Sequence, residues 1–184
     1  WPLLKLKRIP SLLWYEHGSV NNILRIASFL CDSSVSGSSQ GFKINSKKHD
    51  VIGHGINTEL FFPLEIFNRS TDIKNIVYIG RISPVKNIHK ILDSLKFIVK
   101  NKSFEFRFSI YGDVVDNNSR NYYSKLKNFV RINNLGDNVF FNKGLPYYDL
   151  NPIYNSADLV ISLSETNSLD KVLLEAMSAG SLVI

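Results

Sequence analysis

Residues 75–99, NIVYIGRISPVKNIHKILDSLKFIV, indicate the fold of this chain. Asn75 to Ile79 is a short apolar run that ends at Gly80, as buried strands do. After a loop, apolar residues recur at helical spacing, at Ile88, Ile91, Leu92, Leu95, Ile98 and Val99. Charged residues occupy the opposite face of that helix. The stretch therefore predicts a strand, a loop and an amphipathic helix in succession.

The same alternation continues to the end of the chain. We expect strands at 106–110, 139–141, 159–163 and from 182 onward, and helices at 122–130, 150–157 and 171–179, with Gly180 as a cap. Strand and helix in turn, with short connections, predict an α/β fold: a doubly wound, Rossmann-like parallel sheet. Such sheets bind ligands at the carboxyl ends of their strands, which here are the loops after Ile79, Tyr111, Phe141 and Leu163.

The residues before Asn75 give a weaker indication of the fold. A helix is expected at 23–31 and a strand at 51–52, and together they do not complete a domain. Residues 33–39 are rich in Ser and Gly and predict a surface loop, whereas residues 63–74 predict a linker. Because the first residue is not Met and the chain stops in a strand, we expect a fragment of a longer protein.

Composition narrows the class of protein. Of 184 residues, 44% are hydrophobic and 21% charged, which is typical of a globular domain. The single cysteine, Cys31, cannot form an internal disulfide, so a cytoplasmic location is expected. No apolar run approaches the ~18 residues of a membrane-spanning helix. The net charge of +6 favours anionic partners such as sugar nucleotides or a membrane surface. Nucleic acid is not expected, because the Lys and Arg residues are scattered and no recognition motif accompanies them.

The first loop after a strand carries two cations, Arg81 and Lys86, five residues apart. Gly80 permits a tight reversal of the chain, and the helix that follows adds partial positive charge at its start. Arg and Lys in this position suit an anionic group such as a phosphate. The alternative is that both are ordinary solvated side chains in a turn.

The last loop leads into a helix that contains Glu175 within the apolar stretch 172–177. A carboxylate in such surroundings is expected to be paired or to accept hydrogen bonds from a ligand. Exposure on the outer face of the helix, or a salt bridge, is the alternative.

Taken in order, several short motifs make this sequence similar to family 4 glycosyltransferases. They are Gly55 to Phe61, Tyr78 to Arg81 with Lys86, Tyr111 to Asp113, Ala157-Asp158, and Leu174 to Met177 with Gly180. The resemblance covers roughly residues 50–184. It implies a GT-B fold, in which 1–62 are the tail of the acceptor domain and an interdomain segment, 63–74 the linker, and 75–184 the donor-binding domain, truncated at its carboxyl end.

The family's activity implies a role for each matching residue. Arg81 and Lys86, next to Gly80, would hold the donor diphosphate and stabilise the charge that develops as the nucleotide leaves. Glu175 would accept hydrogen bonds from the ribose, and the loop with Gly144 and Leu145 would pass beside the base. Amides at Ser168, Leu169 and Asp170 would face the diphosphate. The activity implied is retaining transfer of a hexose from a nucleotide-diphosphate sugar to a glycan, lipid-linked or small-molecule acceptor, with no cofactor or metal. Such enzymes also contact membranes peripherally through a basic face.

One departure affects the acidic motif. The family has two glutamates eight positions apart, but the residue eight before Glu175 is Asn167. We expect Asn167 to take the sugar-side role, with Glu165 as the alternative if the loop holds a two-residue insertion. Asp170 near a diphosphate would be repulsive unless Lys171 or Arg81 pairs with it.

The same fold class hosts two other functions. A noncatalytic nucleotide- or sugar-phosphate-binding module on the same fold is kept open by Asn167, and activity of the full-length protein would distinguish it. A dinucleotide-dependent oxidoreductase is disfavoured, because no strand is followed by Gly-x-Gly-x-x-Gly. Since transfer needs both halves of a cleft, the fragment alone is expected to bind nucleotide but to turn over little.

Overall fold

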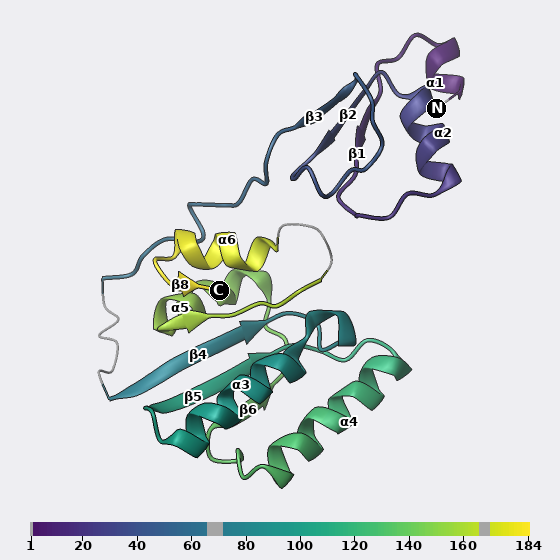
Figure 1. Ribbon diagram of the computed structural model, residues 1–184. Coiled ribbons are helices and arrows are strands. Elements are labelled where there is room, and N and C mark those ends of the chain that lie inside the picture. Colours follow the sequence, from purple (N-terminus) through teal and green to yellow (C-terminus); the bar gives the residue numbers. More distant parts are fainter. Residues whose placement is uncertain (1, 66–71, 166–169) are drawn as a thin grey trace. The chain divides into compact units, whose positions relative to one another are not determined.

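The computed structural model describes residues 2–65, 72–165 and 170–184 (Figure 1). The described residues form two compact units, 2–55 in one and 56–165 with 170–184 in the other. Each unit is built on a parallel sheet. The predicted α/β class is therefore confirmed.

The larger unit contains a five-stranded parallel sheet with the order β6-β5-β4-β7-β8. Its strands are β4 (Ile73–Ile79), β5 (Glu105–Tyr111), β6 (Val139–Asn142), β7 (Leu159–Val160) and β8 (Leu182–Val183). The chain starts in the middle of the sheet, extends it to one side through β5 and β6, and then returns to build the other side. This is the order of a doubly wound sheet.

Helices cover both faces of this sheet (Figure 1), α3 (Ile88–Asn101) and α4 (Asn117–Ile132) on one side, α5 (Leu150–Ser156) and α6 (Lys171–Ser178) on the other. The central strand β4 supplies both cores, because side chains alternate along a strand. Tyr78 packs with α3 and α4, whereas Val77 packs with α5 and α6. Burial of both faces explains why the second half of β4 is a continuous apolar run.

The helix ends follow their local sequence. The Asp116 side chain accepts a hydrogen bond from the Ser119 amide at 2.7 Å and so caps the start of α4. At the end of α6, Gly180 follows the capping residue Ala179 and has φ +81°, a conformation that glycine adopts readily. Two short 3-10 helices, η1 (Pro84–Lys86) and η2 (Tyr147–Asp149), lie in loops next to the sheet.

The strand β7 is shorter than the predicted 159–163, although the chain beyond it still pairs with its neighbours. The amide of Ile161 donates to the carbonyl of Val77 at 2.9 Å, and that of Ser162 donates to Ile184 at 2.8 Å. Residues 161 and 162 therefore stay fixed to the sheet, and the loop that follows starts from a defined position.

The smaller unit has a three-stranded parallel sheet, β1 (Leu12–Trp14), β2 (Ser33–Ser36) and β3 (His49–Val51), in the order of their numbers. The helix α2 (Asn22–Leu30) packs on it around a small apolar core, and the short helix α1 (Pro2–Leu6) precedes it. None of the helices in the described ranges is long and apolar enough to cross a membrane.

The prediction of a surface loop at 33–39 is wrong, because Ser33–Ser36 is the central strand β2 of this sheet. Ser34 and Ser36 are buried, and the hydroxyl of each lies within hydrogen-bond distance of the His49 ring, at 3.3 and 3.1 Å. Polar side chains enter a buried strand when such partners are present. A Ser-rich sequence alone does not reveal those partners.

The predicted domain boundaries remain predictions. The larger compact unit begins at Ile56, within the segment expected to join two domains. Of the expected linker 63–74, residues 66–71 lie outside the described residues.

Candidate functional site

The strand order of the larger sheet reverses between β4 and β7, since the chain continues from β4 to one side and returns through β7 on the other. In doubly wound sheets the loops at such a reversal diverge and leave room for a ligand at the carboxyl edge. The loop after β4 carries Arg81 and Lys86, and the chain after β7 leads to Asp170 and α6. Most of the predicted site residues that the structure describes are therefore grouped around this point.

The turn after β4 depends on two glycines. Gly80 has φ +149°, and its amide donates to the carbonyl of Tyr111 at 3.0 Å. Gly112, at the end of the neighbouring strand, lies so close that a Cβ on it would overlap the Gly80 carbonyl oxygen. The backbones of the two loops thus pack directly on each other, which fixes the main chain that leads into Arg81.

The side chain of Arg81 is exposed, and no hydrogen bond or ion pair of its guanidinium is found within the described ranges. Its backbone is held, because the Tyr78 hydroxyl donates to the Arg81 carbonyl at 2.9 Å. A fixed backbone with a solvated guanidinium is suited to binding an anion from solution.

Lys86 is placed by the residue that follows it. Asn87 adopts a left-handed conformation with φ 51°, which Asn tolerates better than most residues. Its buried side chain donates to the carbonyl of Leu163 at 2.9 Å. This contact ties the β4–α3 loop to the chain after β7, and it brings Lys86 toward the start of α6.

Lys86 and Asp170 form a salt bridge in which the Lys86 Nζ lies 3.1 Å from the Asp170 Oδ2. The hydroxyl of Ser162 donates to the same carboxylate oxygen at 2.7 Å. The two charged side chains are only 14% and 18% exposed. Lys86 is therefore the partner that balances Asp170, and the ion pair found here is not with Lys171 or Arg81, the partners the sequence suggested.

Glu175 lies inside, as the apolar stretch around it indicated. Glu175 is only 5% exposed, and the Tyr154 hydroxyl donates to its Oε2 at 2.8 Å. Burial raises the pKa of the Glu175 carboxyl above its usual range, while the bond from Tyr154 lowers it. Glu175 is thus paired with a neutral phenol, which leaves its carboxylate free to accept further hydrogen bonds.

The predicted base-side loop lies at the ends of β5 and β6. The amide of Gly144 donates to the Asp113 carboxylate at 3.2 Å, and Leu145 is partly exposed beyond it. A cavity of about 210 Å³ opens here, lined among others by Gly112, Asp113 and Asn142. The loop is therefore anchored to the turn that contacts Gly80.

Glu165 lies at the edge of this arrangement, since its amide donates to the carbonyl of Val85, next to Lys86, at 3.2 Å. Its carboxylate pairs with the Lys90 ammonium at 2.7 Å, and its side chain is 66% exposed. Lys90 lies on α3, so the pair belongs to the outer rim. The other predicted residues of this loop, Asn167, Ser168 and Leu169, lie outside the described residues.

Asp170 connects the two sides of the site electrostatically. Burial raises the pKa of the Tyr78 phenol, and the charge of Asp170 raises it further. The same charge adds to the effect of burial on the pKa of both Tyr154 and Glu175. The charge of Asp170 thus acts on Tyr78 of β4 as well as on Tyr154 and Glu175 of the helices beyond β7.

Three contributors were missed by the sequence analysis: Asn87, Ser162 and Tyr154. Asn87 follows directly after Lys86, and Asn is common in left-handed turns, so that signal was present. Ser162 and Tyr154 read as ordinary residues of a strand end and an apolar helix face, and nothing local distinguishes them. Their roles depend on contacts with residues far along the chain.

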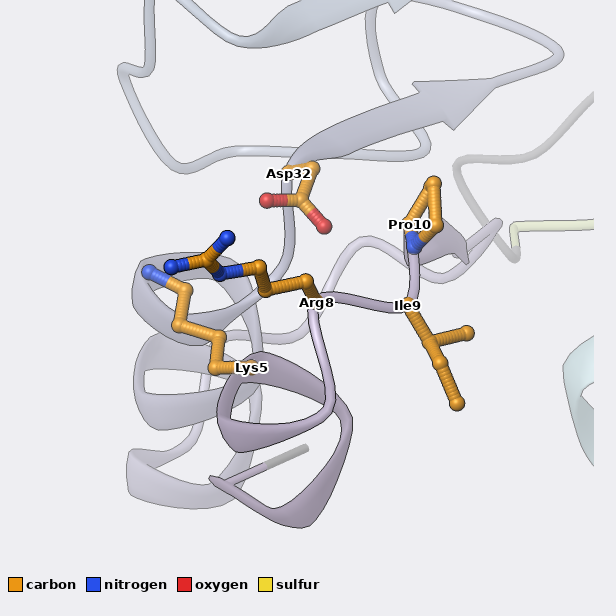
Figure 2. A pocket seen from close by; sticks show the side chains of 5 residues that line it. All are labelled: Lys5, Arg8, Ile9, Pro10 and Asp32. Atoms are coloured by element: carbon orange, nitrogen blue, oxygen red, sulfur yellow. The ribbon is translucent and has the colours of Figure 1, made fainter.

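A larger open cavity, about 540 Å³, lies in the smaller unit and is lined by Lys5, Arg8, Ile9, Pro10 and Asp32 (Figure 2). Figure 2 shows Lys5 and Arg8 side by side, with Asp32 near them. The Asp32 carboxylate already accepts from the amide and hydroxyl of Ser11, at 2.8 and 2.9 Å. Hydrogen bonds from Ser11 lower the pKa of Asp32. The cavity therefore combines two cations with a firmly held carboxylate.

The comparisons with known proteins agree with this architecture. A family model described as "Glycosyl transferases group 1" matches residues 64–184. No curated protein matches the chain. Among solved structures, a glycosyltransferase from Rickettsia africae ESF-5 aligns with a TM-score of 0.76 and 18% identity, over 94% of this chain and 50% of that one.

Two further structures give similar values. Anabaena HepE in complex with UDP and glucose aligns with a TM-score of 0.78 and 18% identity, over 98% of this chain and 53% of that one. Sucrose-phosphate synthase from Thermosynechococcus elongatus aligns with a TM-score of 0.76 and 19% identity, over 100% of this chain and 52% of that one. These identities support the shared fold alone. The chain spans about half the length of each of these structures.

Proposed function

This chain belongs to the family of group 1 glycosyl transferases, and on that premise we propose that it is the donor-binding part of a retaining, family 4-like enzyme. The whole protein moves a hexose from a nucleotide-diphosphate sugar to a glycan, lipid-linked or small-molecule acceptor. Because the chain spans half of its structural neighbours, transfer is proposed for the longer protein and donor binding for this chain.

One observation carries the proposal: two cations and a buried carboxylate come from the two segments that flank the reversal of the strand order. Arg81 and Lys86 come from the loop after β4, and Glu175 comes from the helix after β7. A nucleoside diphosphate carries both kinds of matching group, anionic oxygens at one end and ribose hydroxyls in the middle. The two halves of the site suit the two halves of such a ligand.

The cations supply charge where the reaction develops it. Breaking the bond between sugar and diphosphate leaves negative charge on the departing phosphate oxygens, and fixed cations stabilise that charge. Arg81 offers a planar fork of donors that is open to solvent, and Lys86 offers a point charge held by Asp170. We therefore assign both residues to the donor diphosphate, and we propose that transfer proceeds without a metal cofactor.

Glu175 supplies acceptors. From the described residues its carboxylate receives one hydrogen bond, that of Tyr154, whereas an ionised carboxylate has room for about four. Ribose hydroxyls are donors of the right kind for the remaining positions. Anabaena HepE was solved with UDP and glucose, which supports a nucleotide sugar as the ligand class.

We also place the protein in the cytoplasm, with peripheral contact to a membrane through basic side chains. The net charge of +6 supports that contact. Sedimentation with anionic and with neutral vesicles tests it, and equal recovery with both would contradict it.

The donor assignment is tested by calorimetric titration of this chain with UDP, GDP and ADP. We expect one of the three to bind saturably, and the Arg81→Ala, Lys86→Ala double variant to lose that binding. The matched control is Lys125→Ala, Arg131→Ala, which removes the same two charges from the exposed surface of α4. Equal affinity of the wild type and the Arg81, Lys86 variant would overturn the assignment.

Two measurements on the longer protein test the rest. The anomeric configuration of the product, read by NMR, distinguishes retention from inversion. Activity after treatment with a chelator tests the proposed independence from metals. Inversion, or a loss of activity that added metal restores, would contradict the corresponding part of the proposal.

A further inference from the structure

Tyr154 and Glu175 form a buried pair that joins α5 to α6. The Tyr154 hydroxyl donates to the Glu175 Oε2 at 2.8 Å, and Tyr154 is fully buried. A buried carboxylate without a donor is costly, so this bond has a structural value. The same bond also restricts the orientation of the Glu175 carboxylate.

The ring of Tyr154 is held from several sides. Phe61, also fully buried, packs edge-on against it, with ring centroids 5.5 Å apart. The backbone carbonyl of Tyr154 accepts from the Ser181 hydroxyl at 2.5 Å and from the Ala157 amide at 3.1 Å. Its hydroxyl therefore has a fixed position, and so does the carboxylate oxygen to which it donates.

The other acceptor positions of Glu175 are not used in the same way. Within the described ranges, no second hydrogen bond to its carboxylate is found. Tyr147, the first residue of η2, lies near enough that the charge of Glu175 adds to the effect of burial on its pKa. One oxygen of Glu175 is thus anchored by Tyr154, while the other accepts no hydrogen bond from the described residues.

We propose that Tyr154 is a positioning residue that orients the Glu175 carboxylate toward the ribose hydroxyls of the donor nucleotide. This inference rests on the proposed function, because it assumes that a nucleotide occupies the site. Tyr154 acts through Glu175 and does not touch the ligand. Removing its hydroxyl therefore weakens only those contacts that depend on the ribose hydroxyls.

The test compares ribose recognition in the wild type and in Tyr154→Phe. Each 184-residue protein is titrated with whichever of UDP, GDP and ADP binds the wild type, and with the 2′,3′-dideoxy form of the same compound. We expect Tyr154→Phe to bind the ribose form about tenfold more weakly, as for a lost hydrogen bond to a charged group. Its affinity for the dideoxy form should be unchanged.

A double-mutant comparison separates positioning from general destabilisation. In a Glu175→Ala background, Tyr154→Phe should have no further effect on either affinity, because the carboxylate that it orients is gone. Tyr122→Phe is the matched control, since the Tyr122 hydroxyl contacts His89 on the surface. It should leave both affinities as in the wild type.

If Tyr154→Phe does not fold, Phe61→Leu provides the second variant, because it keeps the phenol but removes its edge-on neighbour. It should reduce the preference for the ribose form in the same direction. Equal losses of affinity for the ribose and dideoxy forms, or an unchanged preference for the ribose form, would overturn the role of Tyr154 and leave the proposed function standing. If the wild type binds none of the three diphosphates, the proposed function fails and this inference fails with it.

Discussion

Lys86 and Asp170 lie 84 positions apart in the sequence, yet they form a half-buried salt bridge of 3.1 Å. Asp170 is the residue that directly precedes α6. An Asp side chain at this position usually accepts a hydrogen bond from a helix amide, but that of Asp170 makes no such bond. It turns instead toward Lys86 and Ser162. A carboxylate therefore occupies the place where we expect the donor diphosphate to approach.

Replacing Asp170 with Asn is expected to strengthen binding of the nucleoside diphosphate. The substitution removes a negative charge that competes for Lys86, and we expect affinity to rise about fivefold, or roughly 1 kcal/mol. Calorimetry on the two proteins measures this. Asp93→Asn, an exposed position on α3, is the control for the same change in charge. Weaker binding in Asp170→Asn would mean that Asp170 holds Lys86 in its binding position.

Glu165→Gln is expected to change little. Ion pairs as exposed as that of Glu165 with Lys90 contribute little, and salt screens them. The affinity for the nucleotide sugar should stay within about twofold of the wild type. Titration with the sugar nucleotide measures this. A large loss would assign to Glu165 the sugar-side role that we expect for Asn167.

Glu175→Gln is expected to separate stability from binding. Because burial raises the pKa of Glu175, the folded protein holds the proton more tightly than the unfolded chain. Its contribution to stability is therefore present below the unfolded pKa and lost as the pH rises through the folded pKa. At pH 7 the Gln variant should unfold at a higher temperature than the wild type, and at pH 4 this difference should shrink.

The same variant should bind the nucleoside diphosphate more weakly at pH 7, because an amide offers one acceptor oxygen where the carboxylate offers two. Thermal unfolding between pH 4 and 8 measures the effect on stability, and calorimetry at pH 7 measures the effect on binding. An unfolding temperature at pH 7 below that of the wild type would show that the charged carboxylate stabilises the fold.

Asp116→Ala is expected to destabilise the protein with the opposite dependence on pH. The Ser119 amide holds the pKa of Asp116 below its usual range. The stability that Asp116 provides is thus present above its unfolded pKa and lost as the pH falls through the lowered value. The unfolding temperature should drop at neutral pH and approach that of the wild type under acidic conditions.

The matched control for this prediction is Asp149→Ala. Asp149 occupies the corresponding position before α5 but makes no side-chain capping bond. It should therefore show a smaller change in unfolding temperature at neutral pH. Equal changes in the two variants would contradict the capping role of Asp116.

The periodicity of the sequence predicted the larger unit well. The central strand β4 is apolar on both faces because helices cover both, whereas β5 alternates and buries Phe106, Phe108 and Ile110 on one face. Helices such as α3 have one apolar stripe. In the smaller unit the strand β2 was not predicted, because its buried serines depend on His49, a partner that no local pattern reveals.

The candidate site residues were named from the sequence and their roles stay predictions, whereas their contacts with one another were not predicted. Arg81, Lys86 and Glu175 stand out because each is charged in an apolar or loop context. That Lys86 pairs with Asp170, and Glu175 with Tyr154, follows from the order of strands and the left-handed turn at Asn87. Such pairings join segments that periodicity treats separately.

The backbone contact between the Gly80 and Gly112 turns restricts how the donor preference of this protein can be changed by directed evolution. Any side chain at position 112 would displace the carbonyl of Gly80 and, with it, the main chain that carries Arg81. A library that varies the loop beside the base should therefore leave position 112 constant and place its diversity at exposed positions such as Leu145. Each of the nineteen amino acids other than glycine would place a Cβ at position 112 against the Gly80 carbonyl, so such library members would carry a distorted Arg81 turn.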